Sequence, residues 1–345
     1  MSTTRDHSST LRSTAEAMVA PGRGILAADE STGTIAKRLA SIGVESTEAT
    51  RRDYRELLFR TPDYERHVSG VILFDETLRQ RAADGTALVE VLRERGVIPG
   101  IKVDAGTAAL PFAPEETITE GLDGLRARLE AYRELGARFS KWRAVLRIGA
   151  GRPSDLALDV NAHALARYAA LSQEAGLVPI VEPEVLMDGA HDVDACYDAS
   201  ERALRTVFAE LARQRVELEG VVLKPSMVLS GKDAPDRAPP EVVAERTLSC
   251  LLRCVPAAVP GIAFLSGGQG DEEAAVNLDA INRLAARRGA PWQLTFSYGR
   301  GLQAAPLQAW AGRPERVAAA QRAFLERARD VAAARMGRYE PVGAD

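Results

Sequence analysis

The sequence predicts an α/β fold, a single (β/α)₈ barrel of the TIM type with additional helices at both ends. Short apolar runs recur along the chain, and a segment of helical periodicity follows each of them. Strands that are apolar over their whole length and alternate with helices are typical of a parallel sheet covered on both faces. Eight such units favour a closed barrel, and an open doubly wound sheet is the alternative.

The predicted strands are short and apolar. Their bounds are 24–29, 71–75, 98–104, 139–145, 178–184, 221–225, 262–266 and 294–298. The clearest amphipathic stretches are 122–135 and 158–175, the second ended by Gly176 as a C-cap. Flanking helices are expected at 10–20 and 314–337. No linker divides the chain, so 1–345 is predicted as one domain, comprising an N-terminal arm and helix (1–20), the barrel (21–312) and a C-terminal helix and short tail (313–345).

The composition excludes several classes of protein. With 46% hydrophobic and 27% charged residues, the chain resembles an ordinary soluble protein, not a disordered or fibrous one. A net charge of −4 gives no basic field for nucleic acid or an anionic membrane. Three cysteines fit reduced cytosolic thiols better than a disulfide framework. No apolar targeting segment or spanning helix is evident, and we expect a cytoplasmic protein.

Lysine is scarce, since only five of the 44 basic residues are lysines. Arginine stays protonated and is not an amine nucleophile, whereas a desolvated lysine can lose its proton. The lysines that remain in such a composition should include those whose chemistry arginine cannot perform. Three of them, Lys102, Lys141 and Lys224, lie in apolar strand-like segments.

Charged residues at i and i+2 occur in three consecutive predicted strands, and such residues point to the same face of a strand. The pairs are Lys102 with Asp104, Lys141 with Arg143, and Glu182 with Glu184. In a barrel, buried charges can be shared at the C-terminal mouth, where barrel active sites lie. Lys224 and Asp29 end two further strands, which predicts one cluster of alternating sign.

This cluster suits imine chemistry. Two lysines in one apolar mouth repel each other, which predicts a lowered pKa for at least one of them. A free amine attacks a carbonyl carbon and forms a Schiff base, and the neighbouring carboxylates Glu182 and Glu184 would supply the proton transfers. The alternative is a purely structural network of salt bridges.

Two glycine-rich segments, 266–270 and 297–301, follow the last two predicted strands. In barrels, these loops often hold a phosphate on backbone N–H groups, and Arg300 adds a bidentate partner for an anion. Residues 31–34, followed by Lys37 and Arg38, form a second candidate anion site at a helix start, or an ordinary N-cap. The four histidines are scattered and there is no CxxC spacing, so no metal site is expected.

These residues resemble the class I fructose-bisphosphate aldolases along nearly the whole chain, from about residue 20 to about residue 337. The segments that carry the resemblance are GRGILAADESTGTIAKRL, GVILFDETL, GIKVD, FSKWRAVLRIG, VPIVEPEVL, LEGVVLKPSM, FLSGGQ and TFSYGR. The resemblance implies reversible cleavage of fructose 1,6-bisphosphate into dihydroxyacetone phosphate and glyceraldehyde 3-phosphate. It also implies that neither a metal nor an organic cofactor is used, and that the chain forms a homotetramer.

The resemblance also assigns roles to residues. Lys224 is the Schiff-base lysine, Glu182 the main proton acceptor and donor with Glu184 beside it, and Asp29 handles the proton of the substrate hydroxyl. Lys141 polarises the site, Arg143 supports it, and Lys102 helps to hold the substrate. Phosphate binding is implied for two groups, the first Ser266, Gly267, Gly268, Ser297, Gly299 and Arg300, the second Ser31, Thr34 and Arg38.

The sequence departs from the family pattern at Asp75, Ala105, Ser226 and Gly270, none of which is a catalytic position. Many family members end in a mobile tail with a terminal tyrosine, to which Tyr339 does not correspond; without that tyrosine we expect slow protonation of the enamine. Two rival functions remain at this stage. One is an imine-forming lyase for another phosphorylated ketose, and the other is an inactive phosphosugar-binding or scaffolding protein.

Overall fold

The structure, a computed structural model, describes residues 3–340 and contains a closed barrel of eight parallel strands. Around the barrel the strands follow the order β1-β10-β9-β8-β7-β6-β3-β2. Their bounds are β1 Gly24–Ala28, β2 Val68–Leu73, β3 Ile98–Lys102, β6 Phe139–Leu146, β7 Val178–Val185, β8 Val222–Leu223, β9 Gly261–Phe264 and β10 Gln293–Tyr298. The predicted (β/α)₈ barrel is therefore confirmed, and the open sheet is wrong.

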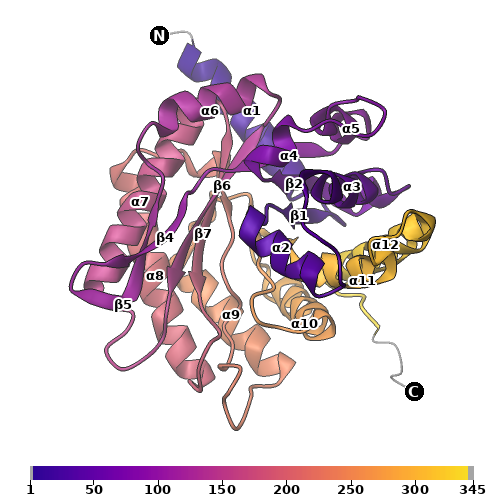
Figure 1. The fold of residues 1–345 in the computed structure, drawn as a ribbon. Helices are drawn as coiled ribbons and strands as arrows, with labels where there is room; N and C mark the ends of the chain where they lie inside the picture. Colours follow the sequence, from indigo (N-terminus) through magenta and orange to yellow (C-terminus); the bar gives the residue numbers. More distant parts are fainter. Residues whose placement is uncertain (1–2, 341–345) are drawn as a thin grey trace.

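Helices surround the barrel (Figure 1). Those that the structure describes are α1 Thr3–Met18, α2 Thr32–Ala40, α3 Glu48–Phe59, α4 Asp75–Arg79, α5 Leu88–Glu94, α6 Leu125–Glu134, α7 Asp155–Glu174, α8 Val193–Arg213, α9 Pro240–Cys254, α10 Asp271–Arg288, α11 Arg300–Trp310 and α12 Val317–Arg335. Short 3₁₀ turns lie at Tyr64–Arg66, Leu218–Gly220 and Pro314–Arg316. The predicted flanking helices correspond to α1 and α12. Gly176 follows the end of α7 with a φ of 75°, as a C-terminal glycine should.

An antiparallel hairpin, β4 Gly106–Leu110 and β5 Ala113–Glu120, was not predicted from the sequence. It follows β3 and lies against β6, where the Thr119 hydroxyl donates to the carbonyl of Arg143 at 2.7 Å. Its turn places Phe112, with a φ of 63°, fully in solvent. The hairpin is an insertion between β3 and α6 and is not part of the barrel sheet.

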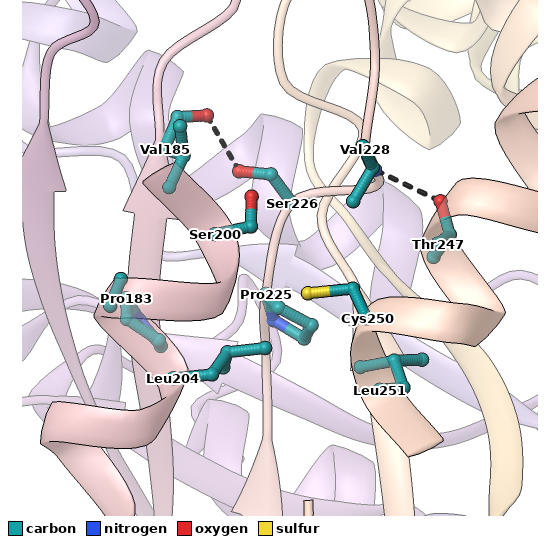
Figure 2. Close-up of a pocket in the computed structure, with 11 residues that line it drawn as sticks. Pro183, Val185, Ser200, Leu204, Pro225, Ser226, Val228, Thr247, Cys250 and Leu251 are labelled. Carbon is teal, nitrogen blue, oxygen red and sulfur yellow. Dashed lines mark hydrogen bonds between the residues drawn. The ribbon is translucent and has the colours of Figure 1, made fainter. Parts of the chain in front are cut away.

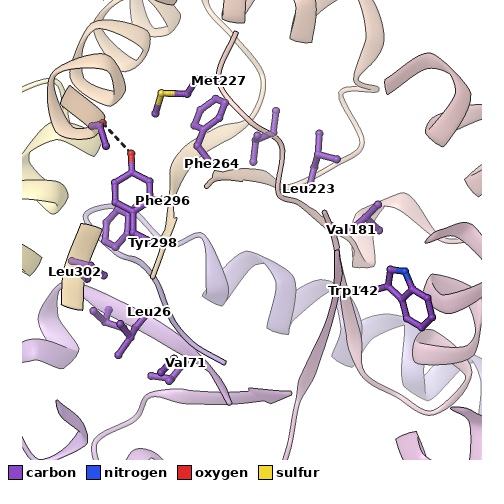
Figure 3. Close-up of a cluster of buried hydrophobic side chains, with 14 of the residues drawn as sticks. Leu26, Val71, Trp142, Val181, Leu223, Met227, Phe264, Phe296, Tyr298 and Leu302 are labelled. Carbon is purple, nitrogen blue, oxygen red and sulfur yellow. Dashed lines mark hydrogen bonds between the residues drawn. The ribbon is translucent and has the colours of Figure 1, made fainter. Parts of the chain in front are cut away.

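Two apolar layers fix the depth at which polar residues can lie. Between the sheet and the helices, side chains such as Leu26, Val181 and Leu223 point outward into one large cluster (Figure 3). Trp142 belongs to this layer and stacks on Tyr168 of α7, with ring centroids 5.5 Å apart, because it alternates with the inward-facing Lys141 and Arg143.

A second cluster fills the lower part of the barrel itself, from Ile25, Ile72, Phe139, Ile180, Val222 and Ala263, with α1 contributing Leu11, Ala15 and Met18. Phe139 fits only because Gly100 has no side chain, since a Cβ there would lie 2.1 Å from the ring. The apolar layer closes the N-terminal end of the barrel, and inward-facing residues further along each strand form the C-terminal mouth.

Candidate active site at the mouth of the barrel

The alternation of side chains along each strand places the site. On β7, Val178 and Ile180 point into the apolar interior of the barrel, so Glu182 and Glu184 point inward above them. The same alternation applies on the neighbouring strand β6, where Phe139 is followed by Lys141. Lys224 is the second residue after inward-facing Val222 on β8, and its backbone N–H still bonds to Val181 at 2.8 Å.

A cavity of about 920 Å³ opens at this end of the barrel. Every site residue predicted from the sequence lines it except Gly268, namely Asp29, Ser31, Thr34, Arg38, Lys102, Lys141, Arg143, Glu182, Glu184, Lys224, Ser266, Gly267, Ser297, Gly299 and Arg300. Gly268 lies on the far side of its loop, where a Cβ would meet Met187. A cavity of this size accommodates a sugar bisphosphate.

The centre of the cavity is a chain of four charged side chains. The Nζ of Lys224 lies 3.3 Å from Oε1 of Glu182, and the Nζ of Lys141 lies 3.4 Å from Oε2 of the same carboxylate. Lys141 is also paired with Asp29, at 2.7 Å from Nζ to Oδ2. The side chains of Lys141, Glu182 and Lys224 are each only 4% exposed. The sequence order of these residues is unrelated to their contacts; the barrel brings them together.

The Oε2 atom of Glu182 is buried and has no hydrogen-bond partner among the described residues, although Lys141 lies within ion-pair distance. A contact of 3.4 Å without good hydrogen-bond geometry leaves a lone pair on that oxygen free. Glu182 therefore keeps one acceptor position that no donor among the described residues fills.

The charges of Lys141 and Asp29 stabilise each other. Burial alone would raise the pKa of Asp29, but Lys141 and Lys224 reverse that effect and lower it to about 2. Burial would lower the pKa of Lys141, but Asp29, Glu182 and Asp104 raise it well above its ordinary value. Lys141 is therefore a cation at neutral pH, and the lowered lysine pKa predicted from the sequence does not apply to it.

Two further ion pairs border the cavity. Lys102 donates to Oδ1 of Asp104 at 2.6 Å and to the carbonyl of the same residue at 2.8 Å. Arg143 bonds to Glu184, and although its burial opposes the charge, this pairing raises the pKa of the guanidinium. These pairs fill two sides of the mouth with charges that a substrate can compete for.

Both candidate phosphate sites line the cavity at the C-terminal ends of neighbouring strands, because α2 follows β1 and β1 pairs with β10. Arg300, the first residue of α11, donates to the carbonyl of Gly267 at 2.9 Å. Ser31 caps α2 by accepting from the N–H of Thr34, so the N-cap alternative is correct for Ser31, which nevertheless lines the cavity. Arg38 of α2 reaches back to Glu30.

Glu30 is a residue of the site that the sequence did not reveal. It binds Arg38 and also Arg55 of α3, whose Nη2 lies 2.6 Å from Oε2 of Glu30. It also accepts from Gln303 of α11 at 2.7 Å. Its position directly after Asp29 is the one signal in the sequence that points to it. The carboxylate ties three helices to the rim.

A small pocket of about 10 Å³ lies behind the mouth, between α8, α9 and the outer faces of β7 and β8 (Figure 2). It has room for about one water and not for a sugar. Here Ser226 donates to the carbonyl of Val185 at 2.8 Å, and the N–H of Val228 bonds to Thr247 at 2.9 Å. These bonds anchor the segment that follows Lys224.

Among residues 3–340, no group of three histidine, cysteine or carboxylate side chains is arranged to hold a metal ion. No helix within the described part of the chain is long and apolar enough to cross a membrane.

A buried amine beside a carboxylate, at the mouth of a (β/α)₈ barrel, defines an enzyme that works through a lysine side chain. The sequence model of the family fructose-bisphosphate aldolase class-I matches residues 10–345. The chain belongs to this family.

Proteins of this family are similar in sequence to this chain over nearly its full length. A probable fructose-bisphosphate aldolase class 1 of Xanthomonas axonopodis pv. citri is 54% identical over 96% of this chain and 98% of its own. The cytosolic fructose-bisphosphate aldolase 4 of Arabidopsis thaliana is 55% identical over 93% of this chain and 81% of its own. Among solved structures, the aldolase of Plasmodium falciparum, crystallised with TRAP and an inhibitor, has a TM-score of 0.96 at 46% identity, covering 97% of this chain and 96% of its own. The chain is an enzyme that cleaves fructose 1,6-bisphosphate reversibly, a reaction of glycolysis.

Proposed function

We propose that Lys224 forms the Schiff base with the ketose and that Glu182, Asp29, Lys141 and Glu184 complete the catalytic set. Lys224 is the buried amine with the looser ion pair, 3.3 Å from Glu182, whereas Lys141 is held 2.7 Å from Asp29. A loosely held amine has less charge stabilisation to lose when its proton leaves. This difference between the two lysines is the observation that carries the proposal.

Glu182 manages the protons of imine formation. When the Lys224 nitrogen attacks the carbonyl carbon, the amine must lose a proton and the carbonyl oxygen must leave as water. Glu182 contacts Lys224 through one oxygen and has an unoccupied lone pair on the other. It can accept the amine proton and return it to the departing hydroxyl. Glu184 lies beside it, paired with Arg143.

Asp29 takes the hydroxyl proton when the carbon–carbon bond breaks. The electrons of that bond pass to the protonated imine on Lys224 and are stored as an enamine, so no metal or organic cofactor is needed. With a pKa of about 2, Asp29 is a carboxylate at neutral pH and is ready to accept the proton of the C4 hydroxyl. Lys141, a permanent cation next to it, stabilises negative charge on oxygen as the bond breaks.

The two phosphates of the substrate are held by two groups of residues on the rim of the cavity. One is held by the N–H groups and side chains of the loops after β9 and β10, that is, by Ser266, Gly267, Gly268, Ser297, Gly299 and Arg300. The other is held at the start of α2 by Ser31, Thr34 and Arg38. Support comes from Arg300 and Arg38, whose guanidinium groups line the cavity with the helix N-terminus of α2. Lys102 contributes a further cation for the substrate.

The test is reductive trapping. Borohydride added with dihydroxyacetone phosphate should attach one triose to the peptide containing Lys224 and abolish activity, as read by mass spectrometry. Borohydride alone is the control and should do neither. Labelling of Lys141 or Lys102 in place of Lys224 would overturn the assignment.

We also propose that the chain folds as one domain, acts in the cytoplasm and assembles as a homotetramer. The cytosolic designation of the Arabidopsis relative supports the location. Sedimentation of the purified protein tests the assembly, with a mass four times that of one 37.1 kDa chain expected. A species that stays at one or two chains at micromolar concentration would contradict it.

A further inference from the structure

The loop after β9, residues 266–270, is held from behind by two buried amide side chains that do not themselves line the cavity. Gln269 belongs to this loop and is 2% exposed; Asn277 lies on the second turn of α10 and is 3% exposed. Burying uncharged amides is costly unless their hydrogen bonds are made, so their arrangement needs a reason.

The two amides form a relay from α10 to the loop. Asn277 donates through Nδ2 to Oε1 of Gln269 at 2.8 Å. Gln269 then donates through Nε2 to the carbonyl of Ser266 at 3.1 Å, and its backbone N–H bonds to the same carbonyl at 3.1 Å. Nε2 also faces the sulfur of Met227 at 3.7 Å. Reversing the Gln269 amide would set its oxygen against that carbonyl, so Asn277 fixes the productive orientation.

The carbonyl of Ser266 determines where the next N–H points. In a planar trans peptide, the C=O of Ser266 and the N–H of Gly267 point in opposite directions. Holding that carbonyl inward therefore directs the N–H of Gly267 away from the core. Gly267 lines the cavity and adopts a φ of 56°, which few other residues tolerate, and its own carbonyl is held by Arg300.

We propose that Gln269 and Asn277 are positioning residues for phosphate binding, through which α10 sets the direction of the Gly267 N–H. The proposal rests on the proposed phosphate role of the loop 266–268. It predicts that these amides act on substrate binding and not on the chemical step, since they lie outside the cavity that contains Lys224 and Glu182.

The variants are Gln269→Met and Asn277→Leu, which keep the volume of each side chain and remove its hydrogen bonds. Either should raise KM for fructose 1,6-bisphosphate and the inhibition constant of inorganic phosphate about tenfold, the usual value of one hydrogen bond to a charged group, with kcat changed less than about twofold. Asn282→Leu is the matched control, because Asn282 lies on the same helix and bonds only within it, to Leu278. Thermal unfolding of each variant confirms that it is folded.

The double variant tests whether Asn277 acts through Gln269. In a Gln269→Met background, Asn277→Leu should change KM no further, whereas independent structural effects would add. Unchanged KM in both single variants, or a loss of kcat equal to the change in kcat/KM, overturns the positioning role. Ser266→Ala and Arg300→Leu distinguish the phosphate role of the loop from the positioning role of Gln269 and Asn277. If Ser266→Ala and Arg300→Leu leave phosphate inhibition unchanged, the proposed phosphate role of the loop is wrong. If these two variants weaken phosphate inhibition but Gln269→Met and Asn277→Leu do not, only the positioning role of the amides is wrong.

Discussion

Lys141 and Asp29 form an ion pair across the mouth of the barrel, 2.7 Å from Nζ to Oδ2, although their strands β6 and β1 are not neighbours. The pair is almost completely withdrawn from solvent, and Lys141 shares its charge with Glu182. It joins the acid–base centre at Lys224 to the part of the cavity next to α2. In a buried ion pair, the burial of each charge is stabilised by the other, so removing one partner destabilises the fold.

Asp29→Asn should therefore lower the free energy of unfolding at pH 7 by up to about 3 kcal/mol, since it leaves the buried Lys141 cation with only its longer contact to Glu182. The double variant Asp29→Asn, Lys141→Met should be more stable than the Asp29→Asn single variant. Urea titrations of the wild-type protein, the single variants Asp29→Asn and Lys141→Met, and the double variant measure the coupling. If the double variant loses the sum of the unfolding free energies lost in the two single variants, the two charges do not stabilise each other.

The pH dependence of that stabilisation has a definite sign. The pKa of Asp29 falls from 3.8 to about 2 on folding, so its contribution is fully present above about pH 4 and is lost as the pH falls through about 2. The stability difference between the wild-type protein and Asp29→Asn should accordingly shrink between about pH 4 and about pH 2. Lys141, whose pKa is raised, keeps its proton throughout this window. A difference that stays constant down to pH 2 would contradict the ion pair as its source.

Lys224→Arg should keep the fold and abolish turnover, because a guanidinium is not an amine nucleophile. Its circular dichroism and unfolding midpoint should stay near those of the wild-type protein, while cleavage of fructose 1,6-bisphosphate falls to background. Lys232→Arg is the control, since that lysine lies outside the cavity on an exposed loop, paired with Asp188. Residual trapping by borohydride in Lys224→Arg would assign the imine to another lysine.

Chelators should leave turnover unchanged, because the protonated imine supplies the electron sink. The measurement compares initial rates before and after prolonged dialysis against EDTA. Activity that is lost on dialysis and restored by zinc would contradict an imine mechanism.

The alternation of strand residues explains why so much of the site could be predicted from the sequence. One inward residue on each strand determines the others, so Lys141 and Glu182 follow from their apolar neighbours, and Trp142 must point away. Charged residues within apolar strands identified the charged cluster, and the glycine-rich segments that follow two of the strands identified the candidate phosphate loops. The fold follows from the same periodicity.

Residues whose role depends on contacts between distant segments could not be predicted. Gln269 and Asn277 are ordinary amides in sequence, and only the packing of α10 against its loop gives them partners. The hairpin around Phe112 was missed because a short antiparallel pair leaves no apolar run of the kind that a barrel strand does. Lys141 was expected to compete with Lys224 for a lowered pKa, but the sequence does not show that Asp29 would reach it.

Arg335 of α12 provides a prediction about stability at the opposite end of the barrel. Its guanidinium is 5% exposed and donates to the carbonyls of Val19 at 2.6 Å and Arg23 at 2.9 Å, and to Gln293 at 2.9 Å. Among the described residues it has no carboxylate within ion-pair distance, and burial lowers its pKa to about 10. The side chain thus ties the last helix to the segment before β1 and to the start of β10.

Arg335→Met should lower the free energy of unfolding by about 3 kcal/mol, because three acceptors lose a donor while the volume is roughly kept. KM and kcat should not change, since these contacts lie at the closed end of the barrel, away from Lys224. Arg335→Lys should recover only part of the loss, because one ammonium cannot match the fork of a guanidinium. Arg329→Met, at an exposed position of the same helix, is the control for removing a charge from α12. Equal effects of Arg329→Met and Arg335→Met in urea unfolding would show that the buried hydrogen bonds contribute nothing.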